Sequence, residues 1–142
     1  MKVLILNGPN LNMLGIREPD IYGRETYDTL VEKIADYACE RGILAEFYQS
    51  NHEGDLVDRI QQAFRDKVDG IVFNPGAYTH TSMALLDALK AVGIPCVEVH
   101  ISDLHSREDF RRISYIRPAC KASVIGHGIR GYLEAIDILL DK

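Results

Sequence analysis

The sequence predicts an α/β fold with a doubly wound parallel sheet, and three observations support this prediction. Five short apolar runs alternate with segments of helical periodicity from one end of the chain to the other. The runs are continuously apolar, which is typical of strands buried on both faces of a parallel sheet. Right-handed crossovers leave few topologies, and the flavodoxin-like order 2-1-3-4-5 suits 142 residues. We therefore expect a five-stranded, three-layer sandwich.

The ends of the expected elements follow from apolar periodicity and from capping residues. Strands are expected at residues 3–7, 43–49, 70–74, 94–99 and 121–125. The first helix is expected to have Thr26 as its N-cap and to stop at Gly42. The second helix is expected to be capped near Ser50 or Asn51 and to bury an apolar stripe that includes Phe64.

Further helical segments complete the pattern. A third helix is expected from about Thr79. Residues 106–109, Ser-Arg-Glu-Asp, indicate the capped start of one short helix. The closing helix carries an apolar stripe that includes Tyr132 and Leu140.

Length and composition indicate a single domain over residues 1–142, large enough to bury about 70% of its unfolded surface. The net charge of −5 argues against a nucleic-acid partner or an anionic membrane. No apolar run reaches membrane-spanning length, and the N-terminus lacks a signal-peptide layout. Cys39, Cys96 and Cys120 form no CxxC pair, which favours three small buried thiols over disulfides or a zinc site, so a reduced cytoplasmic location is expected.

The loop after the first strand is too long for a simple connection. It spans residues 7–23, NGPNLNMLGIREPDIYG, whereas short βα connections need 2–6 residues. It contains Arg17 and Tyr22, a guanidinium and a phenol at the two ends of an arc stiffened by Pro19. A cation close to a phenol favours its ionised form, so this loop predicts a reactive tyrosine.

Polar residues gather where the expected strands end. In open α/β sheets, ligands bind beyond the carboxyl ends of the strands, at the point where strand order reverses. That point lies between the first and third strands. Residues 7–10, 74–82 and 100–105 bring Asn, Tyr, His and Ser side chains to this edge, and the amino ends carry nothing comparable. This asymmetry predicts a small-molecule site.

Several reaction classes lack their motifs in this chain. There is no GxSxG elbow for serine hydrolysis and no GxxxxGK[ST] loop for phosphoryl transfer. A phospho-accepting receiver domain would need carboxylates where this chain has Asn7 and Asn74. His100 and His105, five residues apart in a loop, are a weak signal for a metal site.

One glycine motif imitates a nucleotide site. Residues 126–131, GHGIRG, match GxGxxG, but a dinucleotide fingerprint also needs a following strand with an acidic residue about 20 positions later. The chain reaches only Lys142. We therefore interpret Gly128 and Gly131 as permitting close contact between the helix and the sheet, and rank dinucleotide binding second.

The remaining side chains favour acid–base chemistry. Tyr22 beside Arg17, histidines near strand ends, and amide side chains that could hold an oxyanion or a water suit proton abstraction next to a carbonyl. Hydrogen bonds would then stabilise the developing enolate.

Three ordered motifs give the chain a family resemblance. Residues 6–23 (LNGPNLNMLGIREPDIYG), 74–82 (NPGAYTHTS) and 98–115 (EVHISDLHSREDFRRISY) resemble the type II 3-dehydroquinate dehydratases, and the resemblance extends from end to end. The resemblance implies a flavodoxin-like lyase that eliminates water from 3-dehydroquinate through an enolate, with anti stereochemistry, giving 3-dehydroshikimate. It implies neither cofactor nor metal, and a role in the shikimate pathway or in quinate breakdown.

The resemblance also implies a role for each matching residue. It makes Tyr22 the base, Arg17 the group that lowers the pKa of Tyr22, His100 the proton donor to the leaving hydroxyl, and Asn10 the residue that positions a water. It places Asn74, His80, Ile101, Ser102 and Arg111 at the substrate, with Arg111 as the partner of a carboxylate. Asp87 would reach a neighbour's site in a dodecamer built from four trimers.

Alternative interpretations stay open at this point. A flavodoxin-like domain that binds a phosphate or nucleotide without chemistry is the second hypothesis, although the loops lack aromatic plates and phosphate-wrapping Ser/Thr runs. Asp87 alone suits a solvent-facing charge, and Arg107, Arg112 and Arg117 suit surface charges or interface partners. The glycines at positions 15 and 23 predict that the segment between them closes as a lid.

Overall fold

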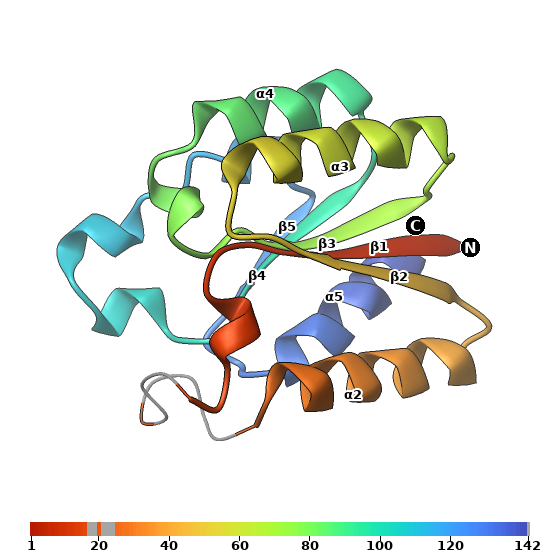
Figure 1. Cartoon of the computed structure of the whole chain (residues 1–142), viewed down its shortest axis with the longest axis horizontal. Helices are drawn as coiled ribbons and strands as arrows, with labels where there is room; N and C mark the ends of the chain where they lie inside the picture. Colours follow the sequence, from red (N-terminus) through yellow and green to blue (C-terminus); the bar gives the residue numbers. More distant parts are fainter. Residues whose placement is uncertain (17–19, 21–24, 142) are drawn as a thin grey trace.

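A computed structural model describes residues 1–16, 20 and 25–141. Its five strands form one parallel sheet in the order β2-β1-β3-β4-β5, which confirms the predicted topology. The strands are β1 (Lys2–Asn7), β2 (Leu44–Gln49), β3 (Gly70–Asn74), β4 (Cys96–His100) and β5 (Ala122–Ile125). All of them point toward the same edge, at the left in Figure 1. Both marked chain ends lie at the opposite edge.

Helices cover both faces of the sheet, as predicted for a three-layer sandwich. Figure 1 shows α2 and α5 on one face and α3 and α4 on the other. Their bounds are α2 (Tyr27–Glu40), α3 (Glu53–Arg65), α4 (Met83–Val92) and α5 (Arg130–Leu140). Short 3₁₀ helices follow β1, β3 and β4: η1 (Leu11–Met13), η2 (Gly76–His80), η3 (Leu104–Ser106), η4 (Asp109–Arg112) and η5 (Arg117–Ala119).

Alternate residues of β1, β3 and β4 pack into two separate cores. Val3 and Ile5 of β1 pack beneath α2 and α5, whereas Leu4 and Leu6 pack beneath α3 and α4. Successive side chains of a strand point to opposite faces, so a strand covered on both sides is apolar at most of its positions. This explains the continuous apolar runs in the sequence.

The helix starts follow the capping side chains. Thr26 Oγ1 accepts a hydrogen bond from Thr29 N, which confirms Thr26 as the cap of α2. The N-cap of α3 is His52, slightly later than predicted, because Ser50 Oγ accepts from His52 N instead of capping a helical turn. The prediction for the third helix was wrong at its start: Ser82 caps α4 through Leu85 N.

Residues 76–80 form the separate helix η2 instead of the first turn of α4. Thr79 is fully buried there, and its carbonyl accepts from Tyr115 N. The predicted single helix at residues 106–109 was also wrong. That region divides between η3 and η4, and the N-cap position of η4 is Glu108.

Several burial predictions were wrong as well. Phe64 is 62% exposed, because Ala63, about 100° away around α3, takes the position facing the core. Leu140, at the end of α5, is 39% exposed.

Cys39 is exposed for the same helical reason as Phe64, since Ala38 beside it is buried. Cys96 is buried as predicted, and all three cysteines are free thiols. None of the described helices is long and apolar enough to cross a membrane.

Candidate active site

A cavity of about 200 Å³ opens at the carboxyl edge of the sheet. It lies near the ends of β1 and β3, the neighbouring strands between which the strand order reverses. Seven of the predicted site residues line it: Asn10, Asn74, His80, His100, Ile101, Ser102 and Arg111. Asp87, although described, does not line it and is exposed on α4. Arg17, Tyr22 and most of the predicted lid at residues 15–23 lie outside the described residues. The cavity therefore brings together residues from three loops that are far apart in the sequence.

Two glycine–proline turns lock the first two of these loops together. Gly8 N–H donates to Asn74 O at 2.7 Å. A Cβ on Gly8 would lie 2.3 Å from the Pro75 carbonyl oxygen, and a Cβ on Gly76 would lie 3.0 Å from the Pro9 carbonyl oxygen. Gly76 also has φ +61°, which a side chain would disfavour. The sequences NGP and NPG thus hold the floor of the cavity by direct backbone contact.

Asn10 begins η1 in a left-handed conformation, with φ 71°. Asparagine tolerates this conformation better than most residues. Its backbone N–H donates to Asn51 Oδ1 at 3.0 Å, and Gln49 Nε2 donates to the same oxygen at 3.1 Å. These bonds tie the start of the first loop to the end of β2.

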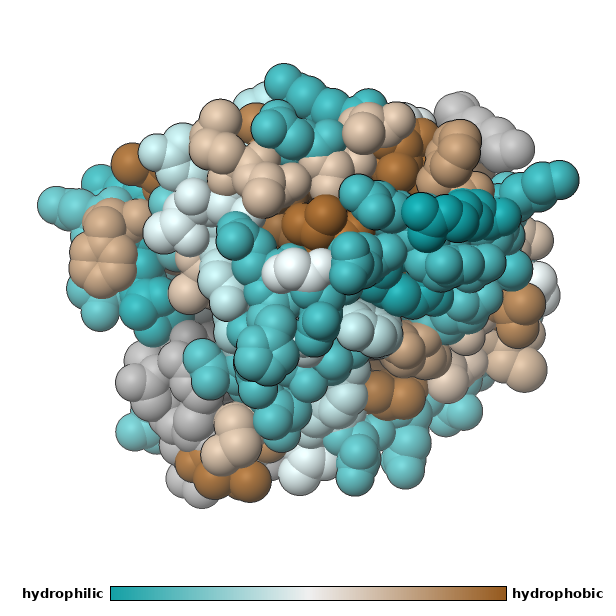
Figure 2. Space-filling view, turned by 45° about the horizontal axis from the view of Figure 1, so that its top comes forward, coloured by the Kyte–Doolittle hydropathy of each residue, from teal (hydrophilic) through white to brown (hydrophobic). Residues whose placement is uncertain are grey.

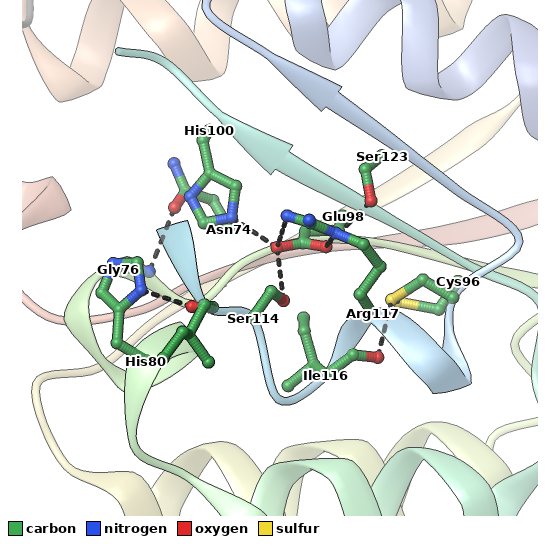
Figure 3. A network of polar contacts seen from close by, with 12 residues as sticks. Asn74, Gly76, His80, Cys96, Glu98, His100, Ser114, Ile116, Arg117 and Ser123 are labelled. Atoms are coloured by element: carbon green, nitrogen blue, oxygen red, sulfur yellow. Dashed lines mark hydrogen bonds and ion pairs between the residues drawn. The ribbon is translucent and has the colours of Figure 1, made fainter. Parts of the chain in front are cut away.

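Glu98, in the middle of β4, is a fully buried carboxylate with four partners (Figure 3). It accepts from His100 Nε2 at 2.6 Å and from Arg117 Nε at 3.1 Å. Ser114 Oγ and Ser123 Oγ donate to it at 2.8 and 2.9 Å. The partners come from β4, from β5 and from the segment between them, so one side chain joins these parts of the chain.

This environment keeps Glu98 ionised. Burial by itself raises the pKa of the carboxyl. The hydrogen bonds from His100, Arg117 and Ser114 outweigh this effect and lower the pKa to about 2. A buried charge is tolerated when it is paired and its lone pairs are satisfied, as they are here. Because the carboxylate can only accept, the Nε2 atom of His100 must carry a hydrogen.

The two pocket histidines are held in different ways. With Nε2 bonded to Glu98, His100 has Nδ1 left for a ligand. His80 Nδ1 bonds to the Ile113 carbonyl oxygen at 2.7 Å, which places the hydrogen on Nδ1 and leaves Nε2 for a ligand. Burial, outweighing the bond to Ile113, lowers the pKa of His80. The neutral His80 ring therefore offers an acceptor nitrogen at pH 7.

Two arginines, Arg107 and Arg111, also line the cavity. Arg111 Nε donates to Glu108 Oε2 at 2.7 Å, an exposed carboxylate that holds the guanidinium beside the cavity. Arg107, which the sequence suggested as a surface charge, lines the cavity instead, and its Nη1 contacts Ser102 Oγ at 3.4 Å. The sequence signal that could have placed Arg107 at the cavity is its position within the third motif, five residues after Ser102. Arg117, also expected at the surface or an interface, keeps 39% of its side chain exposed and in addition binds buried Glu98.

A wider hollow of about 760 Å³ lies at the amino edge of the sheet. Its few polar side chains include Asp69 and Lys121. Lys121 Nζ donates to the carbonyls of Ile138 and Asp141, and Asp69 Oδ2 accepts from Lys2 N. These polar groups are already hydrogen-bonded to the backbone near the two ends of the chain. The size of the hollow alone therefore does not make it a functional site. In the described ranges, no cluster of three or more His, Cys, Asp or Glu side chains is placed to hold a metal ion.

Comparisons with known proteins agree with this geometry. The family model for dehydroquinase class II matches residues 1–140. A 3-dehydroquinate dehydratase of Caldicellulosiruptor bescii is 54% identical over 135 residues, covering 95% of this chain and 93% of that protein. A type II dehydroquinase crystal structure from Butyrivibrio crossotus has a TM-score of 0.98 and 53% identity, covering 99% of this chain and 97% of the other. The chain belongs to the dehydroquinase class II family.

Proposed function

We propose that this chain is a 3-dehydroquinate dehydratase, a lyase that converts 3-dehydroquinate to 3-dehydroshikimate and water. The observation that carries the proposal is the cavity at the switch point, where acceptor, donor and cationic groups converge in a chain of this family. The product belongs to the shikimate pathway to aromatic amino acids, or to quinate breakdown. A cytoplasmic location suits either role.

The reaction needs a base, an acid and a group that stabilises the enolate. In our proposal the Tyr22 phenolate, stabilised by Arg17, takes the proton from C2 of the substrate. The resulting enolate interacts with a water positioned by Asn10. The enolate then re-forms the carbonyl and expels the C1 hydroxyl, which leaves as water with a proton from His100. These assignments for Tyr22 and Arg17 come from the sequence motifs alone.

The geometry of the described residues supports the acid role of His100. Its Nε2 hydrogen is held by Glu98, so the proton for the leaving group would come from Nδ1. A carboxylate on the far nitrogen orients an imidazole and stabilises its cationic form, as in the serine-protease triad. Ser114, Ser123 and Arg117 keep that carboxylate in place. His100 can then regain its proton after each turnover without moving.

The remaining pocket residues would bind the substrate. Arg111 suits the substrate carboxylate, since its Nε is held by Glu108 and its terminal nitrogens remain for a bidentate contact. The acceptor nitrogen of His80 suits a substrate hydroxyl. Asn74, Ile101 and Ser102 would complete the contacts along the floor of the cavity.

The ultraviolet absorbance of the conjugated enone product tests this proposal directly. Purified protein mixed with 3-dehydroquinate should produce the absorbance at a rate proportional to enzyme concentration. EDTA should leave the rate unchanged, because the proposed steps use no metal. A protein that binds the substrate without producing the enone would instead be the binding domain considered from the sequence.

The pH dependence of the rate tests the roles of Tyr22 and Arg17. A free tyrosine has a pKa of about 10, so about one phenol in a thousand is ionised near pH 7. Arg17→Ala should lower kcat sharply at neutral pH and less at high pH, where the phenol ionises unaided. Tyr22→Phe should lose rate at every pH while still binding substrate. An equal loss for Arg17→Ala at all pH values would assign Arg17 to substrate contact instead.

The surface supports an assembly, which we propose to be a dodecamer of four trimers with Asp87 reaching a neighbour's site. Met83, Phe110, Ile113 and Tyr115 are all at least 39% exposed. Figure 2 shows tan and brown side chains among hydrophilic ones at the left end of the molecule, where η3 and η4 lie in Figure 1. Sedimentation at assay concentration should give the dodecamer. A fully active monomer would contradict both the assembly and the shared site.

A further inference from the structure

The glycine motif at residues 126–131, which leads into α5, is left unexplained by the proposed catalytic roles. Gly131 is buried, and a Cβ built on it would lie 3.3 Å from Val124 Cγ1 and 3.4 Å from Val99 Cγ1. Gly131 therefore allows α5 to lie directly on β4 and β5, as the sequence predicted. Gly128 was predicted to do the same, but a Cβ there would meet nothing within 4 Å. Its role is the left-handed turn, with φ +63°.

The close approach of α5 brings Tyr132 to the ends of β1 and β3. Tyr132 is fully buried, and its hydroxyl lies between two asparagine side chains. Asn74 Nδ2 donates to the hydroxyl at 3.0 Å, and the hydroxyl donates to Asn7 Oδ1 at 2.6 Å. Burial raises the pKa of Tyr132, so the phenol keeps the proton that it donates.

One unambiguous donor sets the direction of each hydrogen bond in this network. The Gly76 backbone N–H can only donate, and it bonds to Asn74 Oδ1 at 3.1 Å. The Asn74 nitrogen must therefore face Tyr132, and the Tyr132 proton must go to Asn7. Asn7 Nδ2 in turn points at Tyr27 Oη, at the longer distance of 3.4 Å.

We propose that Tyr132 is a positioning residue of the active site, which acts by holding the Asn74 amide in one orientation. Asn74 lines the cavity, and its amide is held from two sides by Gly76 and Tyr132. One Nδ2 hydrogen is used on Tyr132, so the second is available to an acceptor oxygen of the substrate. The inference rests on the proposed function above, in which Asn74 binds the substrate.

Without the hydroxyl, the Asn74 nitrogen would lose its internal acceptor and the amide could turn. Substrate binding would then have to order the amide. This reduces affinity for substrate and transition state alike, which raises KM and leaves kcat nearly unchanged. Loss of one positioned neutral hydrogen bond corresponds to a rise in KM of about fivefold to tenfold.

The test is the steady-state kinetics of Tyr132→Phe with 3-dehydroquinate, followed by ultraviolet absorbance. We expect KM to rise about fivefold to tenfold, with kcat within about threefold of wild type. A merely structural role would lower the concentration of folded enzyme, and hence the apparent kcat, while leaving KM unchanged. That result would overturn the inference.

Two matched variants separate the possible causes. Tyr27→Phe makes the same chemical change at the other end of the network and should leave KM unchanged; an equal rise in KM would show a general effect of network loss and contradict the inference. Asn74→Ala tests the underlying assignment. If Asn74→Ala leaves KM unchanged while wild type produces the enone, the dehydratase function stands and the inference fails with Asn74.

A further variant applies if Tyr132→Phe does not fold. Gly131→Ala retains the hydroxyl but pushes α5 outward by a few tenths of an ångström, because its Cβ would be tight against Val124 and Val99. We expect a smaller rise in KM, about twofold to threefold, in a protein with native circular dichroism. An unchanged KM in this folded variant would also overturn the inference.

Discussion

Two buried polar networks meet at the active-site cavity from opposite faces of the sheet. Glu98 lies on the α3/α4 side and binds cationic or polar groups, including His100. Tyr132 lies on the α2/α5 side and binds the neutral amides of Asn7 and Asn74. One network is charged and supports the proposed acid. The other is neutral and supports a proposed substrate ligand.

The difference shows how one cavity can receive two kinds of support. A buried charge makes strong hydrogen bonds, but it costs much when a partner is lost and it responds to pH. A neutral network is weaker and insensitive to pH near neutrality, and it sets orientation through the fixed polarity of its bonds. Proton transfer suits the first and recognition suits the second. The two networks should therefore respond differently to mutation and to acid.

The largest effect is expected from Glu98→Ala. The change leaves His100, Arg117 and two serines without their common acceptor, and it opens a cavity in β4. We expect the free energy of unfolding in urea to fall by about 3–5 kcal/mol, and kcat to fall as His100 loses its orientation. A loss below about 1 kcal/mol would show that the charged network contributes no more than the neutral one.

The second-largest effect is expected from acid, which should weaken the charged network. The pKa of Glu98 is about 2 in the folded protein against 4.5 ordinarily. A carboxyl with a lowered folded pKa contributes stability that is complete above its unfolded pKa and is lost as pH falls toward its folded pKa. This gives a loss of about 2 kcal/mol between pH 6 and pH 3.

Urea unfolding at both pH values would measure this loss in wild type and in Glu98→Gln, which lacks the titrating group. The variant should lose about 2 kcal/mol less than wild type over the same interval. Parallel losses in the two proteins would remove Glu98 as the source of the acid sensitivity.

Tyr132→Phe should destabilise the protein by less than Glu98→Ala, by about 1–2 kcal/mol in urea. The change preserves packing but leaves Asn7 Oδ1 and Asn74 Nδ2 without a buried partner. Between pH 5 and pH 8 this loss should not vary, because no group of the neutral network titrates there. A loss that varied with pH in that range would connect Tyr132 to the charged network.

Tyr27→Phe should have the smallest effect, below about 0.5 kcal/mol, since its bond to Asn7 is long at 3.4 Å. Differential scanning calorimetry against wild type would measure the shift in Tm. A shift as large as that of Tyr132→Phe would mean that Asn7, and not the pair of asparagines, is the centre of the neutral network.

Sequence reasoning reached most of the fold, because its signals are local. Continuous apolar runs, helical periodicity and Thr26 as a cap depend on neighbouring residues, and crossover handedness then left few sheet orders. The same logic placed Asn10, Asn74, His80 and His100 at one edge, since the ends of parallel strands meet there. Arg17 and Tyr22 remain predictions of the motifs.

Only the tertiary structure decided how these residues are held. No spacing rule relates Glu98 to Ser114, Arg117 and Ser123, or Tyr132 to an asparagine 125 positions away. Such contacts depend on which elements the sheet order makes adjacent and on how closely α5 approaches the sheet. Sequence periodicity determined most of the residues that face inward, whereas hydrogen-bond partners were decided by three-dimensional packing, because buried polar groups must find partners wherever the fold brings them.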